Sequence, residues 1–250
     1  MERTVIYYDE IDSTNEQAKE LARQGAICGT LLVADRQSAG RGRRGRVWES
    51  PAGENIYMSL IVRPNLDVQQ APMLTLVMAY SVTQAMEEMT NLDVQIKWPN
   101  DLVICKKKVC GILTEMSLND SHIDYVVVGV GINVNSKGFP RHLQDKATSL
   151  YMESGQQIPK EKLIQCVMEK FEHNYAVFMQ TRNLSFLQTE YNRRLVGREK
   201  EVRVLEPGNE YQATAHGINA KGELIVTKEN GERETIYAGE VSVRGIYGYV

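Results

Sequence analysis

The spacing of apolar residues predicts a mixture of strands and helices over the first 195 positions. The predicted strands are short β-branched, aromatic or apolar runs, and they cover residues 4–8, 30–35, 56–62, 94–104 (strand, turn, strand), 109–117 and 123–134. Apolar residues with helical spacing predict helices over 71–89, 159–180 and 183–195. The run 56–62 is apolar on both faces, which predicts a central strand, and 109–117 and 123–134 are predicted as buried strands.

A further helix is predicted within DSTNEQAKELARQG, residues 12–25. Ser13 and Glu16 have the spacing of a capping box, and Gly25 can end the helix. Residues 105–108, CKKK, predict a turn between two strands. These elements together predict one large domain over residues 1–195.

The pattern changes after Gly197. Short strands are predicted over residues 200–205, 211–218, 223–229 and 234–247. NAKG (219–222) and NG (230–231) have the composition of tight turns. Residues 196–250 therefore predict a second, all-β domain, and at roughly 50 residues its own core would be marginal, so we expect it to pack against the larger domain.

The composition is that of an ordinary globular protein. Of 250 residues, 42% are hydrophobic and 24% charged, and the net charge of −3 argues against a protein that coats polyanions. No apolar run approaches the roughly 20 residues of a membrane span, and the N-terminus lacks the layout of a signal peptide. Four cysteines form no CxxC pair, so we expect a reduced, cytoplasmic location. The four histidines are scattered, so no side-chain metal cluster is expected.

The most unusual stretch is GRGRRGR, residues 40–46, which directly follows a predicted strand. Arginine binds carboxylates and phosphates through a planar fork of donors, and glycine lets the backbone approach a ligand closely. No GxxxxGK[ST] motif is present, so this loop is not a Walker nucleotide cradle. Three interpretations remain open at this point: a nucleic-acid-binding segment, a solvated loop, or a site for a compact anion.

Three other segments carry polar groups at strand ends. KWPNDL (97–102) places Asn100 and Asp101 at a turn, and its pattern alone is equally typical of a simple turn signal. Lys106, Lys107 and Lys108 would be a solvated hairpin tip in most proteins. GVGINVN (129–135) resembles part of a dinucleotide fingerprint, but no helix opens after it, so that interpretation is rejected.

In this order, the segments DSTN, QSAGRGRRGRVW, KWPNDL, KKVCGIL and GVGINVN resemble the catalytic domain of biotin protein ligases. The resemblance covers about residues 4–190. It implies an α+β fold, with a mixed β-sheet catalytic domain of the biotin/lipoate ligase (class II aminoacyl-tRNA synthetase-like) type and a small C-terminal SH3-like β-barrel. Related lipoate ligases share this fold but lack GRGRRG, so the loop favours biotin.

The resemblance also implies the chemistry. Such ligases use ATP with Mg²⁺ to convert biotin to biotinyl-5′-AMP, and then transfer biotin to one lysine of a biotin carboxyl carrier protein. The metal would arrive with the ATP phosphates, near Asp101, rather than on a dedicated side-chain cluster. Cationic groups aimed at the developing charge are what such a reaction between two anions requires.

The site residues implied by the resemblance fall into three groups. Biotin contacts are expected from Ser13, Thr14, Asn15, Gln37, Gly40, Arg41, Gly42, Lys108, Gly111 and Gly129. Adenylate contacts are expected from Arg41, Arg43, Arg46, Trp48, Asn100, Asp101, Lys108, Gly131 and Asn133. Arg43 and Lys108 are expected to act in catalysis, and Asn100 and Asp101 either lie near the phosphates and Mg²⁺ or brace the loop.

Several roles within these groups follow from the same likeness. Ser13, Thr14 and Gln37 would hydrogen-bond the ureido ring, whereas Trp48 would pack beside adenine and Asn133 would hydrogen-bond it. The arginine loop is expected to be disordered when empty and to fold over the ligand. No N-terminal DNA-binding domain is expected, and a homodimer is left open. The rival interpretations are a lipoate or octanoate ligase of the same fold and a nucleic-acid-binding protein that uses GRGRRGR.

Overall fold

The computed structural model describes residues 3–206, 208–238, 241–245 and 249–250. Its elements, in chain order, are β1 (Thr4–Ile11), α1 (Thr14–Arg23), β2 (Thr30–Gln37), η1 (Arg43–Gly45), β3 (Ile56–Val62), η2 (Val68–Gln70), α2 (Met73–Thr90), β4 (Gln95–Lys97), β5 (Asp101–Ile104), β6 (Lys107–Asn119), β7 (His122–Ile132), α3 (Leu150–Ser154), α4 (Lys160–Thr181), α5 (Ser185–Arg194), β8 (Lys200–Glu206), β9 (Asn209–Ile218), β10 (Leu224–Lys228), β11 (Arg233–Ile236) and β12 (Ser242–Gly245).

A seven-stranded mixed sheet forms the centre of the molecule, with the order β1-β2-β3-β7-β6-β5-β4. Only the β1–β2 pair is parallel, and the other neighbours run antiparallel. All seven residues of β3 are buried, which confirms the central strand predicted for 56–62. The pairing of the long strands β6 and β7 sets Gly111, from the KKVCGIL segment, opposite Gly131, from the GVGINVN segment.

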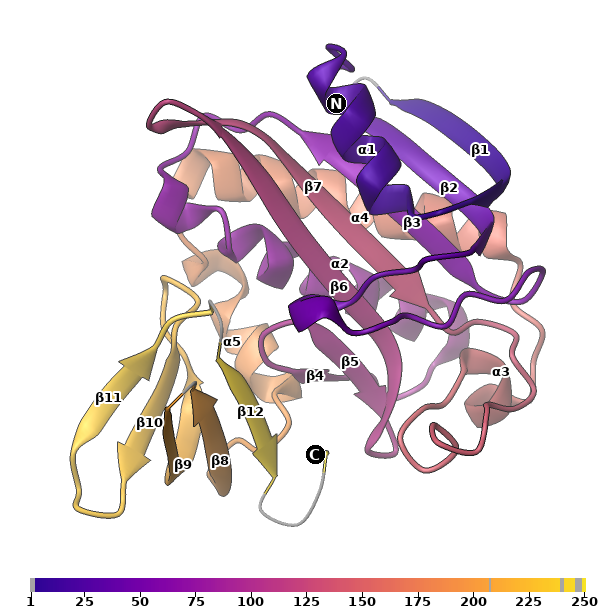
Figure 1. Cartoon of the computed structure of the whole chain (residues 1–250). Coiled ribbons are helices and arrows are strands. Elements are labelled where there is room, and N and C mark those ends of the chain that lie inside the picture. The colour runs from indigo at the N-terminus through magenta and orange to yellow at the C-terminus, as the bar shows by residue number, and fades with distance from the viewer. Residues whose placement is uncertain (1–2, 207, 239–240, 246–248) are drawn as a thin grey trace.

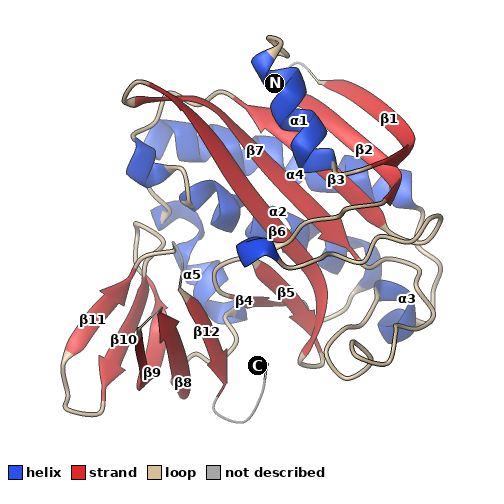
Figure 2. Cartoon of the chain, in the orientation of Figure 1, coloured by secondary structure: helices blue, strands red, loops and turns tan. Residues whose placement is uncertain are grey.

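The two faces of this sheet are covered differently (Figure 1). Helices α2 and α4 lie against each other on one face, and the largest buried cluster lies beneath them. The other face carries α1, which contacts β3 and β7, and the loop that contains η1 crosses it in front of β6 (Figure 2). The second face is therefore covered by α1 and by this loop.

The C-terminal strands form a separate five-stranded antiparallel sheet, with the order β11-β10-β9-β8-β12. It packs against the larger part of the chain through α5, where Asn192 Oδ1 accepts a hydrogen bond from Ile218 N at 2.7 Å. Trp98 Nε1 donates to Gly222 O at 3.0 Å. Residues of both parts belong to one continuous buried cluster, which confirms the expected packing between them.

Most predicted elements are present, with corrected ends. The helices predicted at 71–89, 159–180 and 183–195 correspond to α2, α4 and α5, and both predicted turns at 219–222 and 230–231 close with backbone hydrogen bonds. The predicted strand 234–247 is wrong as one element, because β11 and β12 are separate strands; residues 239–240 and 246–247 of that range lie outside the described residues. The short α3 was not predicted.

Three local predictions also need correction. The capping box is absent. The Ser13 side chain makes no capping bond, and Ser13 N donates to Asp12 Oδ1 at 2.6 Å rather than to the Glu16 carboxylate, which pairs with Lys19. The turn at 105–108 contains only its first two residues, so Lys107 and Lys108 belong to β6. The strand predicted at 109–117 is buried only in its first half, and Met116 is 42% exposed.

Candidate active site

The floor of the site is a strip of sheet that lacks side chains. Gly129 and Gly131 lie two residues apart on β7, so they share one face, and Gly111 of β6 is the register partner of Gly131. A Cβ at Gly129 would lie 2.0 Å from Asn15 Oδ1, and one at Gly131 would lie 2.5 Å from Trp48 Cε2. These glycines therefore leave room for the Asn15 amide and the Trp48 indole to lie directly on the sheet.

The start of α1 provides a polar wall at one end of this floor. Gln37 Oε1 accepts hydrogen bonds from Thr14 N at 2.8 Å and from Thr14 Oγ1 at 3.1 Å, and Gln37 Nε2 donates to Ser50 Oγ at 2.9 Å. Ser13, Thr14 and Asn15 are all buried, although each carries a polar side chain. Buried polar groups of this density are typical of a site that binds a polar molecule.

The arginine loop covers the floor from the solvent side (Figure 2). Arg41 and Val47 form an isolated antiparallel bridge, and Gly42 N donates to Arg46 O at 2.7 Å, so the loop closes on itself. Gly40 lies where a Cβ would be 2.4 Å from Trp48 O, which only glycine permits. The loop backbone thus fixes where Arg41 and Trp48 leave the chain.

Arg43 connects this loop to two distant parts of the chain. Its Nη1 donates to Asn100 Oδ1 at 2.8 Å, and its Nη2 donates to Val241 O at 3.1 Å. Asn100 is itself held, because its Nδ2 donates to Ile112 O at 3.1 Å. The guanidinium is therefore positioned by the KWPND turn and by the C-terminal part of the chain at the same time.

A buried carboxylate lies beneath the cationic groups. Asp101 is 9% exposed, and its Oδ1 lies 2.6 Å from Lys108 Nζ. Burial alone would raise the pKa of Asp101, but the charges of Lys108 and Lys97, together with hydrogen bonds from Lys108 and Tyr249, hold it below its usual value. Burial lowers the pKa of Lys97 to about 8, against the opposing charge of Asp101. This end of the site is thus rich in positive charge at neutral pH.

Two neighbouring cavities meet at Trp48 and Lys108. The first has a volume of about 50 Å³, and it is lined by the predicted residues Ser13, Thr14, Asn15, Gln37, Arg41, Gly42, Arg43, Trp48, Asn100, Lys108, Gly111, Gly129 and Gly131. The second is an open cleft of about 920 Å³ between the two parts of the chain, and it is lined by the predicted residues Arg46, Trp48, Asp101, Lys108 and Asn133. Gly40, the first residue of the loop, lines neither of these two cavities, and a Cβ there would meet Trp48 O.

Two side chains define the junction between the cavities. The Trp48 Nε1 is buried without a hydrogen-bond partner among the described residues, and Lys108 Nζ lies 5.1 Å from the Trp48 ring centroid. Asn133 lies on the cleft side, where its Nδ2 donates to Thr148 O at 3.0 Å. An unpaired buried indole N–H costs free energy, so Trp48 is suited to move or to gain a partner when a ligand enters.

Sequence reasoning missed several lining residues. Tyr57 lines the first cavity, and Arg203, Arg244 and Tyr249 bring the C-terminal part of the chain to the second. Tyr57 comes to the first cavity because it is the register partner of Gly131 in the β3–β7 pair, which the sequence does not show. No sequence signal marks the other three, because their approach depends on how the C-terminal sheet docks.

Among the described residues, no group of three or more His, Cys, Asp or Glu side chains could hold a metal ion. Asp101 and Glu49 are the carboxylates that line the second cleft. No helix in the described part of the chain has the length and apolar character to cross a membrane.

Comparison with known proteins gives the family. Residues 7–133 match the Biotin/lipoate A/B protein ligase family, and residues 199–244 match the Biotin protein ligase C terminal domain. A bifunctional ligase/repressor BirA from Bacillus spizizenii is 39% identical over 97% of this chain and 75% of its own length. A biotin–[acetyl-CoA-carboxylase] ligase from Paracoccus denitrificans is 30% identical over 94% of this chain and 98% of its own length.

The folds agree as well. A biotin protein ligase from Aquifex aeolicus, solved in complex with biotin and ATP, has a TM-score of 0.86 at 33% identity and covers 97% of this chain and 99% of its own. The mixed sheet and the separate C-terminal sheet described above match that arrangement. With both family models matched in order and a fold shared over nearly the whole length, this chain belongs to the biotin protein ligases of the biotin/lipoate A/B protein ligase family.

Proposed function

We propose that this enzyme activates biotin with ATP as biotinyl-5′-AMP and transfers the biotinyl group to a lysine of a biotin carboxyl carrier protein. The observation that supports it most strongly is the junction of the two cavities at Lys108 and Trp48. A small polar pocket and a larger cationic cleft share these two side chains. A reaction that joins a carboxylate to a nucleotide phosphate needs its two substrates to meet in this way.

Biotin is assigned to the first cavity. Its ureido ring would bind at the polar end formed by Ser13, Thr14 and Gln37, whose side chains offer both donors and acceptors. Its fused rings would lie over the glycine floor, and its carboxylate would point toward Lys108. The Trp48 indole lies against this floor at Gly111 and Gly131, so the fused rings would displace it.

The nucleotide is assigned to the second cleft. Trp48 would stack on adenine, and Asn133 would present its Oδ1 to the adenine amino group, since its Nδ2 already donates to Thr148 O. Arg41, Arg43, Arg46 and Lys108 would contact the phosphates. When bound, Mg²⁺ would neutralise charge on the ATP phosphates. Asp101 and Glu49 are carboxylates that line this cleft, and carboxylate oxygens are ligands of the kind that Mg²⁺ binds.

The reaction then has two steps. A biotin carboxylate oxygen attacks the α-phosphorus of ATP, the new C–O–P bond forms, and the bond to the β-phosphate breaks to release pyrophosphate. The neutral amine of the acceptor lysine attacks the acyl carbon, the amide bond forms, and AMP leaves with the electron pair of the C–O bond. Lys108 and Arg43 stabilise the negative charge that develops on the phosphate oxygens in both steps.

Transfer to a carrier protein and a cytoplasmic location belong to the same proposal. Four unpaired cysteines agree with a reducing compartment. Two domains, 1–195 and 196–250, remain our division of the chain, and the separate C-terminal sheet supports it.

Mass spectrometry of the protein incubated with biotin, MgATP and no acceptor tests the first step. We expect bound biotinyl-5′-AMP, together with release of an equal amount of pyrophosphate. Replacing biotin with lipoate or octanoate should give neither product. Adenylate formed from lipoate but not from biotin would overturn the assignment and favour the rival ligase activity.

A further inference from the structure

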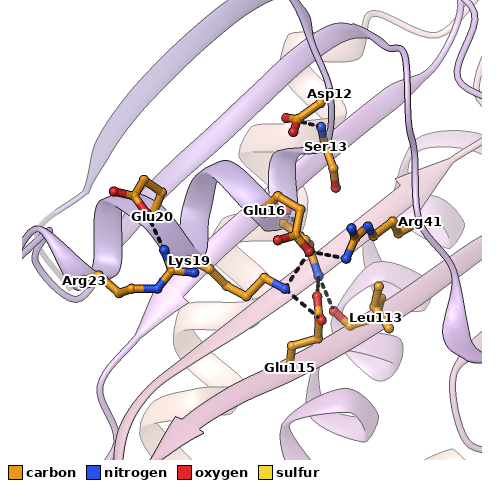
Figure 3. Close-up of polar contacts among 11 residues, drawn as sticks. Asp12, Ser13, Glu16, Lys19, Glu20, Arg23, Arg41, Leu113 and Glu115 are labelled. Carbon is orange, nitrogen blue, oxygen red and sulfur yellow. Dashed lines mark hydrogen bonds and ion pairs between the residues drawn. The ribbon is translucent and has the colours of Figure 1, made fainter. Parts of the chain in front are cut away.

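Arg41 stands at the end of a row of charged side chains, and the assigned reaction does not use the other members of this row (Figure 3). Its Nη1 forms an ion pair with Glu16 of α1, and Glu16 Oε1 lies 2.6 Å from Lys19 Nζ. Lys19 Nζ also lies 3.0 Å from Glu115 Oε1 on β6. Positive and negative groups therefore alternate from the loop, across the helix, to the sheet.

This row is partly shielded from water. The side chain of Lys19 is 19% exposed, and those of Glu16 and Glu115 are 28% and 30% exposed. Burial lowers the pKa of Lys19, but the hydrogen bonds that Lys19 donates to both carboxylates outweigh this effect and raise the pKa above its usual value. Lys19 is thus held charged between two acids, and it fixes the Glu16 carboxylate that receives Arg41.

The same row is continuous with the floor of the first cavity. Asn15 Nδ2 donates to Glu115 Oε2 at 2.8 Å. The hydroxyl of Ser59 lies 2.6 Å from Asn15 Oδ1 and 2.8 Å from Thr14 Oγ1, and Thr14 bonds to Gln37 as described above. One unbroken set of polar contacts therefore connects the residues assigned to the ureido ring with the guanidinium at the mouth of the cavity.

A guanidinium on a glycine-flanked loop needs such support. The loop backbone fixes where Arg41 leaves the chain, but the side chain is 55% exposed and both sequence neighbours are glycines, so adjacent side chains of the loop restrict the guanidinium little. Arginine carries several N–H donors, and the contact with Glu16 uses Nη1, so other donors can meet an anion in the cavity. Glu16 thus holds the Arg41 side chain over the first cavity, which Arg41 lines, and leaves other guanidinium donors of Arg41 available to bind phosphate.

We infer that Glu16 is a positioning residue for Arg41, fixed by Lys19 and Glu115, and that it keeps the guanidinium at the mouth of the biotin cavity to retain the adenylate. This inference rests on the proposed function. It assigns to the first helix a part in holding the intermediate, in addition to its part in binding the ureido ring.

Release of preformed biotinyl-5′-AMP tests this, measured by chasing labelled adenylate with excess unlabelled biotin and ATP. For Glu16→Gln we expect release about three- to tenfold faster than wild type and a raised KM for biotin, because the positioning ion pair is lost but the shape is kept. The matched control is Glu20→Gln, one turn further along α1, which removes the exposed pair with Arg23 and should leave release within about twofold of wild type.

The double variant Glu16→Gln/Arg41→Gln separates positioning from general damage to the helix. If Glu16 acts through Arg41, the double variant should release adenylate at the rate of Arg41→Gln alone. An undiminished effect of Glu16→Gln in the Arg41→Gln background would overturn the inference, as would a Glu16→Gln enzyme equal to Glu20→Gln. Failure of the proposed function would be recognised earlier, because the wild-type protein would then form no biotinyl-adenylate at all.

Discussion

At the scale of single residues, the site gathers more positive charge than its one buried carboxylate can balance. Lys97 and Lys108 both face Asp101, and Lys97 Nζ also lies 3.5 Å from the Tyr249 ring centroid. Lys97 is the more deeply buried of these two lysines, with an exposed fraction of 8%. Its charge is therefore maintained against desolvation, which gives it a measurable effect on folding.

Lys97→Met tests this effect through the pH dependence of stability. The pKa of Lys97 is about 8 in the folded protein and near its ordinary value of 10.5 in the unfolded chain, so the unfolded state binds more protons between these limits. In the wild type, this lysine should make the free energy of unfolding rise with pH from about 8 to about 10.5, by up to about 3 kcal/mol. Urea denaturation across this range should show that rise in the wild type and a smaller slope in Lys97→Met. Equal slopes in the two proteins would contradict the assignment of a lowered pKa.

At the scale of elements, the arginine loop is the segment that we expect to respond most to a ligand. It is closed by the bridge between Arg41 and Val47, and Arg43 is fastened to Asn100 and to Val241 O. Ligand phosphates would compete for the same guanidinium donors. We therefore predict that the loop changes its protection from solvent exchange when the intermediate forms.

Arg43→Gly should weaken retention of the adenylate by about tenfold or more, because a charge-assisted contact and the fastening of the loop are lost together. The expected consequence is transfer of biotin to lysines of bystander proteins, which blotting for protein-bound biotin measures. Hydrogen exchange supplies the structural readout: amides of residues 40–48 should slow on addition of biotin and ATP in the wild type, and slow less in the variant. An Arg43→Gly enzyme that retains the adenylate like the wild type would contradict the closing loop.

Elements also determine where the apolar pattern succeeds or misleads. The helices α2 and α4 are long, and the helical spacing of their apolar residues alone located them. The second half of β6 is apolar in places yet exposed, as Met116 and Leu118 show. An apolar alternation predicts a strand, but it cannot show whether another element lies against it.

At the scale of the whole molecule, the C-terminal part of the chain contributes to the cleft that we assign to the nucleotide. Arg203, Arg244 and Tyr249 line that cleft opposite Trp48 and Lys108, whereas the first cavity is built from the larger part of the chain. Docking of the small sheet should therefore affect ATP more than biotin.

Asn192→Ala tests this dependence at a distance from both cavities. Asn192 bonds to the backbone of Ile218 in both directions, with its Nδ2 donating at 3.1 Å and its Oδ1 accepting at 2.7 Å. Its loss should lower the free energy of unfolding by about 1–2 kcal/mol and raise KM for ATP severalfold, with KM for biotin nearly unchanged. Gln165→Ala, on the exposed side of α4, is the control and should change neither constant. A larger rise in KM for biotin than for ATP would contradict this division of the site.

The sequence by itself determined the order of most elements and the chemical character of the site. The spacing of apolar residues identifies helices and buried strands, because each kind of secondary structure returns its side chains to the buried side at a characteristic interval. The motifs GRGRRGR and KWPND left several interpretations open, and the resemblance of five segments in order favoured a ligand site. All of the residues taken from these motifs and from DSTN and GVGINVN, except Gly40, line one of two adjoining cavities.

The tertiary structure alone decided how those motifs meet. The register of β6 on β7 sets Gly111 beside Gly131, the pair Arg43–Asn100 spans 57 positions, and the contact from Arg43 to Val241 spans 198. The alternating row from Arg41 to Glu115 joins a loop, a helix and a strand that no local pattern connects. The spacing of apolar residues is a property of neighbouring positions in the sequence. Contacts between distant residues depend instead on strand order and domain docking, which are determined by the packing of the whole chain.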